Sequence, residues 1–415
     1  MTTGTGVTMT KQRTAQAASV AVFAVFFLNG FNFATWASRL PAVRDGLEFS
    51  ESQMGLLLLV IAVGSLVALP LAGMVVERLG AARTVTVFAL LNALGLILAS
   101  TGVGVDGVPV TVVGLVVFGV GTGVWDAAMN LEGAAVEQKL GRTVMPRYHA
   151  GFSFGTFAAA GVAVVAAGLE VPVWIHLPVA VVLTSICVLV AVRSFLPSAD
   201  EHAVAPSPGT EPAASAPRGA RGALAAWIEP RTLLIGLVVL AAALTEGSAN
   251  DWVSLAVVDG WDAQDALGAV AFAVFVGTMT TARWFGTWML DRYGRVAVLR
   301  TCSVLALVGL LIFGLAAPLW LAMIGVVLWG AGAALGFPVG MSAASDDPAR
   351  AAARVSVVST IGYSAFLAGP PLLGLLAHHV GYRHALLAVA IPTVLGLLVT
   401  GAAAPLRKVP ATAAD

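Results

Sequence analysis

A succession of apolar segments, each about 20 residues long, limits the fold of this chain more than any other feature of its sequence. A helix needs roughly 20 apolar residues to cross the hydrocarbon core of a bilayer. Such segments lie at 17–37, 53–76, 84–101, 110–133, 149–169 and 174–195, and then at 232–255, 267–290, 296–316, 318–341, 355–377 and 384–404. Since 59% of the 415 residues are hydrophobic and only 11% are charged, a soluble globular fold is excluded. The sequence therefore predicts an all-α membrane protein with about twelve transmembrane helices.

The twelve segments form two groups of six, separated by a stretch of different composition. Residues 197–230 are rich in Pro, Ala, Ser and Gly and cannot bury enough apolar surface to fold. We predict an N-terminal six-helix half at 1–196, a flexible cytoplasmic linker at 197–230 and a C-terminal six-helix half at 231–415. The first segment is too long for a cleavable signal peptide, so we interpret it as a retained span.

The positive charges predict the orientation. With the N-terminus inside, eighteen of the 22 Lys and Arg residues fall in cytoplasmic segments, and only Arg39, Arg44 and Arg383 fall in outer loops. Cytoplasmic loops are the ones that carry excess Lys and Arg. We therefore expect a multi-pass protein of the bacterial cytoplasmic (inner) membrane with both termini in the cytoplasm. The net charge of zero does not indicate a nucleic-acid partner.

Two loops repeat one short pattern at matching places in the two halves. Glu77-Arg78-Leu79-Gly80 follows the second segment, with Arg83 just beyond, and Asp291-Arg292-Tyr293-Gly294 follows the eighth. A short turn that contains glycine lets two helices pack closely, and its acid can pair with a basic group or a helix N-terminus on the facing half. The pattern predicts gating loops made by Glu77, Arg78, Gly80, Arg83, Asp291, Arg292 and Gly294.

Asp126 lies within the fourth segment, where a charge costs about 2.5–3.5 kcal/mol on insertion scales. With Asn130 it belongs to a small and polar stripe at helical spacing, together with Gly119, Thr122, Gly123 and Gly133. This stripe faces either a cavity, as a proton or substrate site, or another helix, as a hydrogen-bonded packing face. We predict that Asp126 carries a coupled proton, with Asn130 and Thr122 one turn to either side hydrogen-bonding its neutral form.

The seventh segment holds two more acids. Glu246 and Asn250 share a helical face, and Asp251 is rotated by about 100° from Asn250. Glu246 and Asp251 are further candidates for proton coupling. Asn250 and Trp252 are candidates for substrate binding.

Other polar and aromatic side chains within the spans are also candidates for substrate binding. Asn29, Asn32 and Trp36 lie on one face of the first segment, and amides beside aromatic rings suit a sugar-like or heterocyclic solute; Trp36 also suits the membrane interface. Arg283 in the eighth segment binds an anionic solute or pairs with a structural acid. In the eleventh segment, Tyr363 and the run Gly369-Pro370-Pro371 indicate a broken or bent helix that lines the pathway.

No cofactor is expected. His378, His379 and His384 have no Cys or carboxylate at metal-ligand spacing, which argues against a metal site. Cys187 and Cys302 lie in separate apolar segments and do not form a disulfide framework.

The loop motifs resemble the signature of the major facilitator superfamily. The chain is similar to its fucose-permease-like members, and closer to a bacterial branch that includes a rhizopine-cluster membrane protein. The resemblance rests on Phe26-Phe27-Leu28-x-Gly30, Pro41, Phe49-Ser50-x-x-Gln53-x-Gly55, Asp126-Ala-Ala-Met-Asn130, Phe152-Ser153-x-Gly155, Glu246-Gly247, Asp251-Trp252 and Gly369-Pro370-Pro371. It implies that Asp126 and Asn130 serve proton coupling and sugar binding. The first-span acid of that family falls at Ala37 here, so its two-acid site is incomplete.

The predicted function is secondary active transport of a small polar solute, a sugar or polyol, by alternating access and coupled to protons. The first alternative is a proton-driven exporter of an amphipathic metabolite or antibiotic. A transport-dead sensor or a membrane enzyme is a remote alternative, because no nucleophile–base pair or metal cluster supports it. We expect a monomer in the lipid bilayer whose partners are a small-molecule substrate and protons.

Overall fold

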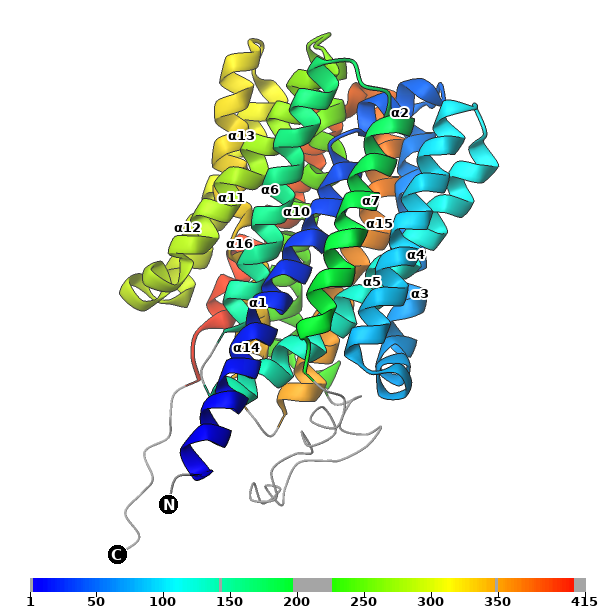
Figure 1. Ribbon diagram of the computed structural model, residues 1–415. Coiled ribbons are helices and arrows are strands. Elements are labelled where there is room, and N and C mark those ends of the chain that lie inside the picture. Colours follow the sequence, from blue (N-terminus) through cyan, green and yellow to red (C-terminus); the bar gives the residue numbers. More distant parts are fainter. Residues whose placement is uncertain (1–2, 142–143, 197–225, 348–349, 407–415) are drawn as a thin grey trace, which may run out of the picture. The chain divides into compact units, whose positions relative to one another are not determined.

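The computed structural model describes residues 3–141, 144–196, 226–347 and 350–406, which form helices and contain no strand (Figure 1). Backbone polar groups have no water to bond in hydrocarbon, and a helix satisfies them internally. The first half of the sequence forms α1 (Thr3–Ala37), α2 (Leu40–Gly46), α3 (Glu51–Leu79), α4 (Ala81–Gly104), α5 (Val108–Leu140), α6 (Met145–Gly168) and α7 (Val173–Ala191). The second half forms α10 (Pro230–Gly260), α11 (Asp265–Tyr293), α12 (Arg295–Leu315), α13 (Leu319–Ala333), α14 (Gly336–Ala344), α15 (Ala351–Ala385) and α16 (Ala390–Val399).

Eleven stretches of the described chain are long and apolar enough to cross a membrane. The last of them, Val357–Ala403, has 47 residues. A helix of that length would measure about 70 Å, more than twice the roughly 30 Å hydrocarbon core. Inside it, Gly381 has φ 76° and ψ 157°, which breaks the helix into two crossings. The prediction of about twelve transmembrane helices is therefore confirmed.

The chain divides into two compact units that do not follow the sequence halves. The first unit comprises Met1–Pro208, Ala249–Thr280 and Pro370–Ala385, and the second comprises Gly209–Ser248, Thr281–Gly369 and Leu386–Asp415. Three helices, α10, α11 and α15, therefore contribute to both units. Most of the predicted linker, 197–225, lies outside the described residues, and the predicted boundaries of the two halves stay a prediction.

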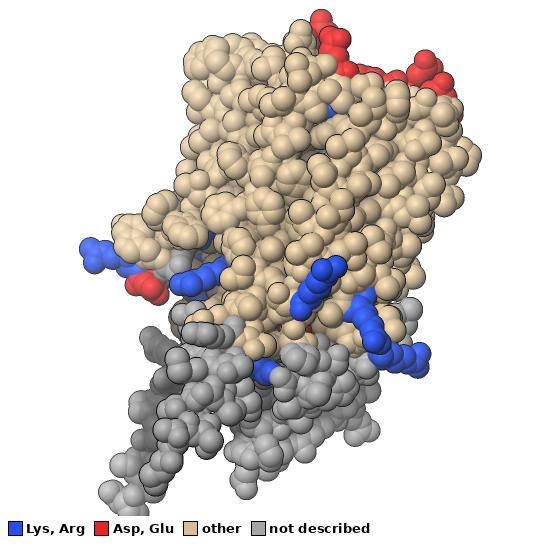
Figure 2. All heavy atoms as spheres, in the orientation of Figure 1, with Lys and Arg blue, Asp and Glu red and all other residues tan. Residues whose placement is uncertain are grey.

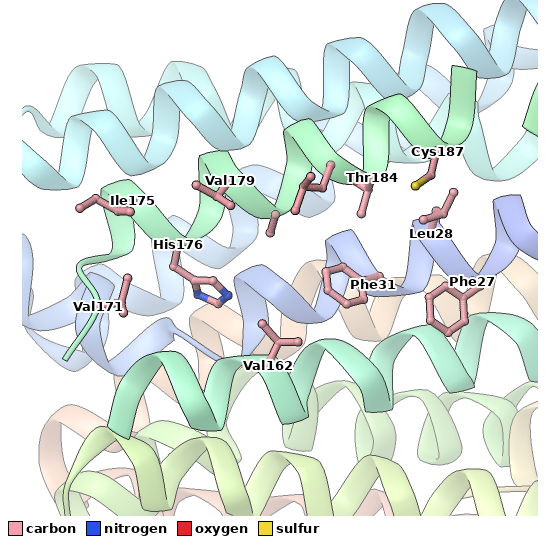
Figure 3. Close-up of a pocket in the computed structure, with 12 residues that line it drawn as sticks. Phe27, Leu28, Phe31, Val162, Val171, Ile175, His176, Val179, Thr184 and Cys187 are labelled. Carbon is pink, nitrogen blue, oxygen red and sulfur yellow. The ribbon is translucent and has the colours of Figure 1, made fainter. Parts of the chain in front are cut away.

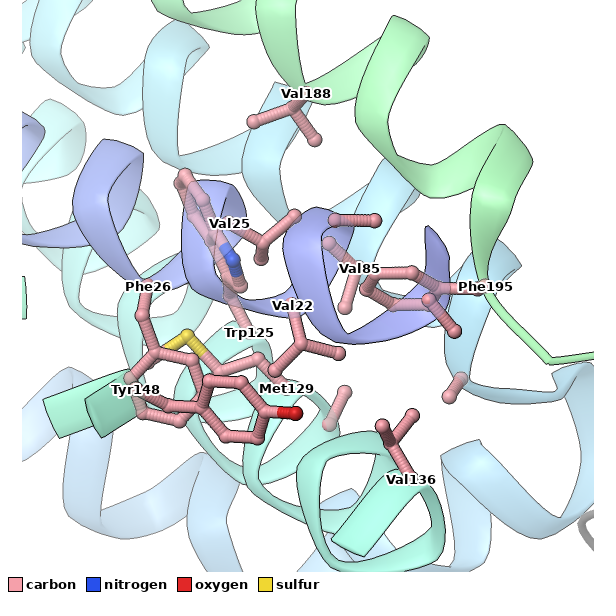
Figure 4. Close-up of a cluster of buried hydrophobic side chains, with 14 of the residues drawn as sticks. Val22, Val25, Phe26, Val85, Trp125, Met129, Val136, Tyr148, Val188 and Phe195 are labelled. Atoms are coloured by element: carbon pink, nitrogen blue, oxygen red, sulfur yellow. The ribbon is translucent and has the colours of Figure 1, made fainter. Parts of the chain in front are cut away.

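In the first unit, large apolar side chains from several helices form one core (Figure 4). Phe26 of α1, Trp125 and Met129 of α5 and Tyr148 of α6 are all fully buried there. Glycines bring α1 and α6 into backbone contact: a Cβ atom added at Gly30 would lie 2.2 Å from the Phe152 carbonyl oxygen, and one at Gly155 would lie 1.9 Å from that of Phe27. No side chain fits at either position, because packed interiors leave no such space.

The two loops with the repeated sequence pattern also share one backbone conformation. Gly80 has φ 77° and ψ 157°, and Gly294 has φ 77° and ψ 161°. Each amide donates to the carbonyl four residues earlier, Gly80 to Val76 at 2.8 Å and Gly294 to Leu290 at 2.9 Å. This region of φ and ψ is accessible essentially only to glycine. The internal repeat predicted from sequence is therefore present in the backbone.

Replacement of Gly80 or Gly294 by Ala should destabilise the protein, because Ala at this conformation costs on the order of 1–3 kcal/mol. We expect a drop of several degrees in the thermal unfolding midpoint of the protein in detergent. The matched control is Gly161→Ala in α6: Gly161 is helical and has nothing within 4 Å of an added Cβ. Its unfolding midpoint should not fall, since Ala favours a helix over Gly.

Candidate transport site

A chain of buried polar side chains links four helices of the first unit. The Asn32 amide on α1 donates to the Asn92 oxygen on α4 at 2.9 Å, and the Asn92 amide donates to the Thr122 hydroxyl on α5 at 2.9 Å. The Thr184 hydroxyl on α7 donates to the Asn32 oxygen at 2.7 Å. Asn32 and Asn92 are almost completely buried. The chain therefore holds these helices together inside the apolar core.

This network changes the interpretation of Asn32. Both its amide nitrogen and its amide oxygen already have protein partners, so it has a structural role that its sequence position does not reveal. The sequence analysis did not select Asn92 or Thr184. A lone Asn within the apolar segment 84–101 was the available signal for Asn92.

The glycine side of the α5 stripe is a packing face. An added Cβ would lie 2.4 Å from the Ile61 carbonyl oxygen at Gly119 and 2.9 Å from that of Ser65 at Gly123, so both glycines abut α3. The Thr122 hydroxyl donates to the Phe118 carbonyl and accepts from Asn92. Of the two interpretations of the α5 stripe, the packing face and not the cavity lining therefore describes Gly119, Thr122 and Gly123.

Asp126 differs from the rest of the stripe. It is partly exposed, and its carboxylate has no hydrogen-bond or ion-pair partner within the described part of the chain. The Asn130 amide donates to the backbone carbonyl of Asp126, at 2.8 Å, rather than to its carboxyl group. In this conformation Asn130 and Thr122 donate to backbone carbonyls of their own helix and not to the Asp126 side chain, so their hydrogen bonding to its neutral form stays a prediction.

The second unit holds an intramembrane ion pair. Arg283 Nη2 of α11 lies 2.7 Å from Glu246 Oε2 of α10, and Arg283 Nε donates to the Ala334 carbonyl at 2.9 Å. Both side chains are partly exposed, at 28% and 22%. Of the two alternatives for Arg283, an anionic solute or a structural acid, the structure thus shows an acid partner.

Tyr363 lies in an aromatic cluster of the same unit, 6.2 Å from Phe337 and 6.3 Å from Phe366 between ring centroids.

The remaining candidates on α10 belong to the first unit. Asn250 and Asp251 are partly exposed, and neither side chain has a partner among the described residues. Trp252 is fully buried and packs against Tyr382, with ring centroids 5.3 Å apart. Trp252 therefore contributes to packing, whereas Asn250 and Asp251 keep polar groups available.

The eleventh span is not broken at its prolines. The helical assignment of α15 continues through Pro370 and Pro371, and its non-helical residue is Gly381. Pro370 has a packing role, since its carbonyl oxygen would lie 2.6 Å from a Cβ added at Gly55 of α3. Gly55 of α3 thus lets the backbones of α3 and α15 approach closely.

A contact layer on the side that the sequence predicts to be the outer one, not itself predicted from sequence, joins segments of both sequence halves within the first unit. Arg44 of α2 pairs with Asp259 at the end of α10 at 3.1 Å and lies 5.9 Å from the ring centroid of Tyr382. Glu51 at the start of α3 lies 3.4 Å from His378 of α15. These contacts hold α2 against α10, and α3 against α15, at this end of the unit.

Several buried donors of the first unit have no hydrogen-bond partner among the described residues. They are the Asn29 amide nitrogen on α1 and the indole nitrogens of Trp36, Trp125 and Trp252. Asn29 is 3% exposed and Trp36 is 2% exposed. An unsatisfied buried donor costs about 1–3 kcal/mol, so a bound oxygen acceptor would be stabilised here.

No group of three or more possible metal ligands occurs among the residues that the structure describes.

Most of the predicted gating residues lie at the surface, but Gly80 is buried. Arg78 and Arg83 of the first unit are exposed, as are Asp291, Arg292 and Gly294 of the second, while the side chain of Glu77 lies outside the described part.

An ionic cluster that was not predicted from the sequence lies near the ends of α10, α12 and α14 in the second unit. Asp346 accepts from Arg231 at 2.8 Å and from Arg295 at 2.6 Å.

In the same unit Glu229, just before α10, forms a bidentate salt bridge with Arg354 of α15. Arg354 Nε and Nη2 lie 2.7 and 2.5 Å from the two carboxylate oxygens. These hydrogen bonds from Arg354 lower the pKa of Glu229 to about 2 from its usual 4.5, and the Thr232 hydroxyl adds a further donor at 2.6 Å. Glu229 is therefore charged throughout the physiological range.

A pKa that is lower in the folded state stabilises the fold above the unfolded pKa. This contribution should be lost as the pH falls from about 4.5 to about 2. We expect Glu229→Gln to lower the thermal midpoint at pH 7 and to flatten the decline of wild-type stability below pH 5. Asp262→Asn is the control, since the exposed Asp262 has no cation within ion-pair distance in the described chain. Equal acid sensitivity of wild type and Glu229→Gln would contradict the assignment.

Comparison with known proteins gives one consistent result. The Major Facilitator Superfamily model matches residues 22–288 and 260–414. The uncharacterized transporter y4wD of Sinorhizobium fredii is 30% identical over 367 residues, covering 86% of this chain and 90% of that relative. Membrane protein MosC of Rhizobium meliloti is 28% identical over 377 residues, covering 88% and 85%.

Solved structures agree in fold. The nucleoside transporter NupG superposes with a TM-score of 0.72 at 15% identity, over 93% of this chain and 98% of that one. The E. coli Fucose:proton symporter FucP superposes with a TM-score of 0.60 at 14% identity, over 92% and 97%. These identities are low, so the structural likeness concerns the fold.

Proposed function

Because this chain belongs to the major facilitator superfamily and is a multi-pass membrane transporter rather than an enzyme, we propose that it moves a small polar organic solute by proton-coupled alternating access. The solute we propose is a sugar or polyol, or a molecule that carries hydroxyl groups in the same way.

The observation that carries the proposal is the contrast between the acids within the spans. Glu246 is neutralised by Arg283 at 2.7 Å, whereas Asp126 is partly exposed with no partner in the described residues. A bare carboxylate is costly in hydrocarbon, and protonation removes that cost before a site closes. We assign the coupled proton to Asp126, with Asp251 as the second acid without a partner. Glu246 then fixes the position of Arg283.

The proposed solute follows from the unsatisfied donors. Asn29 and Trp36 present N–H groups to a buried region of the first unit, and Asn130 and Asn250 add amides that are partly exposed. A solute with several oxygen acceptors would satisfy such donors, while aromatic rings suit the apolar face of a sugar ring. The similar structures are named for nucleoside and fucose transport, and both kinds of molecule carry sugar hydroxyls.

Asp126→Asn imitates the protonated state and should separate binding from coupling. A thermal-shift screen of sugars, polyols and nucleosides on the purified protein would identify the solute. In proteoliposomes the variant should bind it within severalfold of wild type and exchange it, yet fail to accumulate it when a pH gradient is imposed.

Two matched variants make this test decisive. Asp251→Asn examines the other partner-free acid, and Glu246→Gln breaks the ion pair with Arg283. We expect Glu246→Gln to weaken binding or stability while accumulation persists at saturating solute. If Asp126→Asn concentrates the solute against its gradient and Glu246→Gln does not, the proton site belongs to α10.

We further propose that the outer contact layer and the repeated loops form the two gates. Arg44, Asp259, Glu51 and His378 close the outer side of the first unit in this conformation. Glu77, Arg78, Gly80, Arg83, Asp291, Arg292 and Gly294 would act at the inner side. The exposed positions of Arg78, Arg83, Asp291, Arg292 and Gly294 argue against a direct contact with the solute.

Arg78→Ala should therefore slow cycling and leave the solute affinity within severalfold of wild type, because Arg78 acts on the conformational equilibrium. Exchange rates in proteoliposomes and equilibrium binding to purified protein measure the two quantities separately. A collapse of affinity with an unchanged exchange rate would contradict the gating role.

We propose that the protein lies in the inner membrane of a bacterial cell with its N-terminus in the cytoplasm. The distribution of charged residues supports this orientation. In Figure 2 most of the visible Asp and Glu residues lie near the top of the view and most of the visible Lys and Arg residues lie lower, with one acidic side chain beside them at the lower left. In the first unit the acidic side includes the turn residues Glu48, Asp106, Glu170 and Asp262, each with φ near 50°. Basic loops stay in the cytoplasm.

A topology reporter fused after Arg221 should give a cytoplasmic signal, and so should one at the C-terminus. The reason is that loops rich in Lys and Arg stay on the cytoplasmic side of the membrane. Paired alkaline phosphatase and green fluorescent protein fusions give opposite signals on the two sides and check each other. A reporter after Asp106 is the control and should read periplasmic. A periplasmic signal after Arg221 would overturn the orientation.

A further inference from the structure

A lateral groove of the first unit opens between α1, α6 and α7 (Figure 3). Its volume is about 380 Å³, within the range of roughly 300–1,000 Å³ typical of ligand sites. Apolar side chains of the three helices line most of it, among them Phe31 of α1, Val162 of α6 and Val179 of α7. Val162 and Val179 are 45% and 55% exposed. Large exposed apolar side chains on a transmembrane helix face the lipid, so the groove faces the bilayer.

A buried histidine points into this groove. His176, in the first turn of α7, is 7% exposed, and Figure 3 shows its ring directed toward Val162. Arg39 Nη1 lies 3.4 Å from His176 Nδ1, and Arg39 Nη2 donates to the Val171 carbonyl at 2.8 Å. Arginine offers only donors, so His176 Nδ1 accepts and the ring proton lies on Nε2. His176 Nε2 has no partner among the described residues, which leaves a buried donor at the outer end of an apolar groove.

Charge adds a preference for an anion. Arg39 is 4% exposed, and no carboxylate lies within 4 Å of it in the described chain. Its Nε is also without a partner there. A buried cation without a close counter-ion is stabilised by a nearby anionic group.

The length of the groove matches one leaflet. From His176 to Cys187, which lines the other end, α7 rises by about 16 Å. Half of the roughly 30 Å hydrocarbon core is about 15 Å. His176 follows the loop between α6 and α7, at the outer end of both helices, where head-group oxygens of the outer leaflet lie.

We propose that this groove is a specific site for a glycerophospholipid of the outer leaflet. One acyl chain lies along α7 between Phe31 and Leu183, and a phosphate or ester oxygen of the head group accepts the His176 Nε2 proton beside Arg39. This site is separate from the polar residues assigned to transport. None of Asp126, Asp251, Asn29 and Trp36 lines the groove, and Thr184, which does line it, belongs to the structural Asn92 network.

The test is native mass spectrometry of delipidated protein titrated with dioleoyl phosphatidylglycerol. Wild type should retain one lipid more tightly than the rest. Leu183→Trp, which fills the groove, should lose that lipid. Ile186→Trp is the matched control: Ile186 is 54% exposed on α7, close to the 59% of Leu183, but does not line the groove. It should bind like wild type.

His176→Phe keeps an aromatic ring and removes the donor. We expect roughly threefold to tenfold weaker binding of the tight lipid, the loss that one hydrogen bond implies. Thermal midpoints of the three variants without added lipid show whether each is folded. Equal retention in Leu183→Trp and Ile186→Trp would overturn the site. Loss in Leu183→Trp with wild-type affinity in His176→Phe would overturn the role of His176 and leave only non-specific lipid contact.

Discussion

A polar group inside the hydrocarbon core has no water to bond, and the arrangement of this protein depends on how each such group is satisfied. Backbone groups are satisfied by helices. Asn32, Asn92, Thr122 and Thr184 satisfy one another across four helices, and Glu246 and Arg283 neutralise each other within the second unit. Among the described residues, Asp126 and the Asn29 amide nitrogen have no protein partner, and the proposed binding of a proton and a solute is assigned to these groups for that reason.

Close helix packing is the second condition, and glycines provide it. Membrane helices gain little from the hydrophobic effect against each other, so van der Waals contact and hydrogen bonds have to hold them. Gly30 and Gly155 bring α1 onto α6, and Gly119 and Gly123 bring α5 onto α3. Gly121 brings α5 onto α4 in the same way, since a Cβ added there would lie 2.5 Å from the Asn92 amide nitrogen, and this approach lets Asn92 reach Thr122. Packing and the polar network are thus one structural solution.

Much of the fold followed from the sequence because hydropathy is a local property. The crossings, the repeated loops at Gly80 and Gly294 and the membership of the major facilitator superfamily were all predicted. The candidate site was predicted less well. Asn32 and Asn92 look alike in sequence, as isolated amides within apolar segments, yet only Asn32 was selected and it proved to be a structural link. Which neighbour an amide meets depends on helices that are far apart in the chain.

The sequence by itself determined that this chain crosses a bilayer about twelve times, roughly which residues form each crossing, and the two loops that contain Gly80 and Gly294, since these depend on composition and local conformation. Only the tertiary structure decided which polar groups have partners. It paired Glu246 with Arg283, turned Asn130 toward a backbone carbonyl and left Asp126 without a partner in the described chain. It also placed Arg39 beside His176 although 137 residues separate them. Hydrogen bonds and ion pairs act over about 3 Å, so they are settled by how helices pack and not by the order of residues.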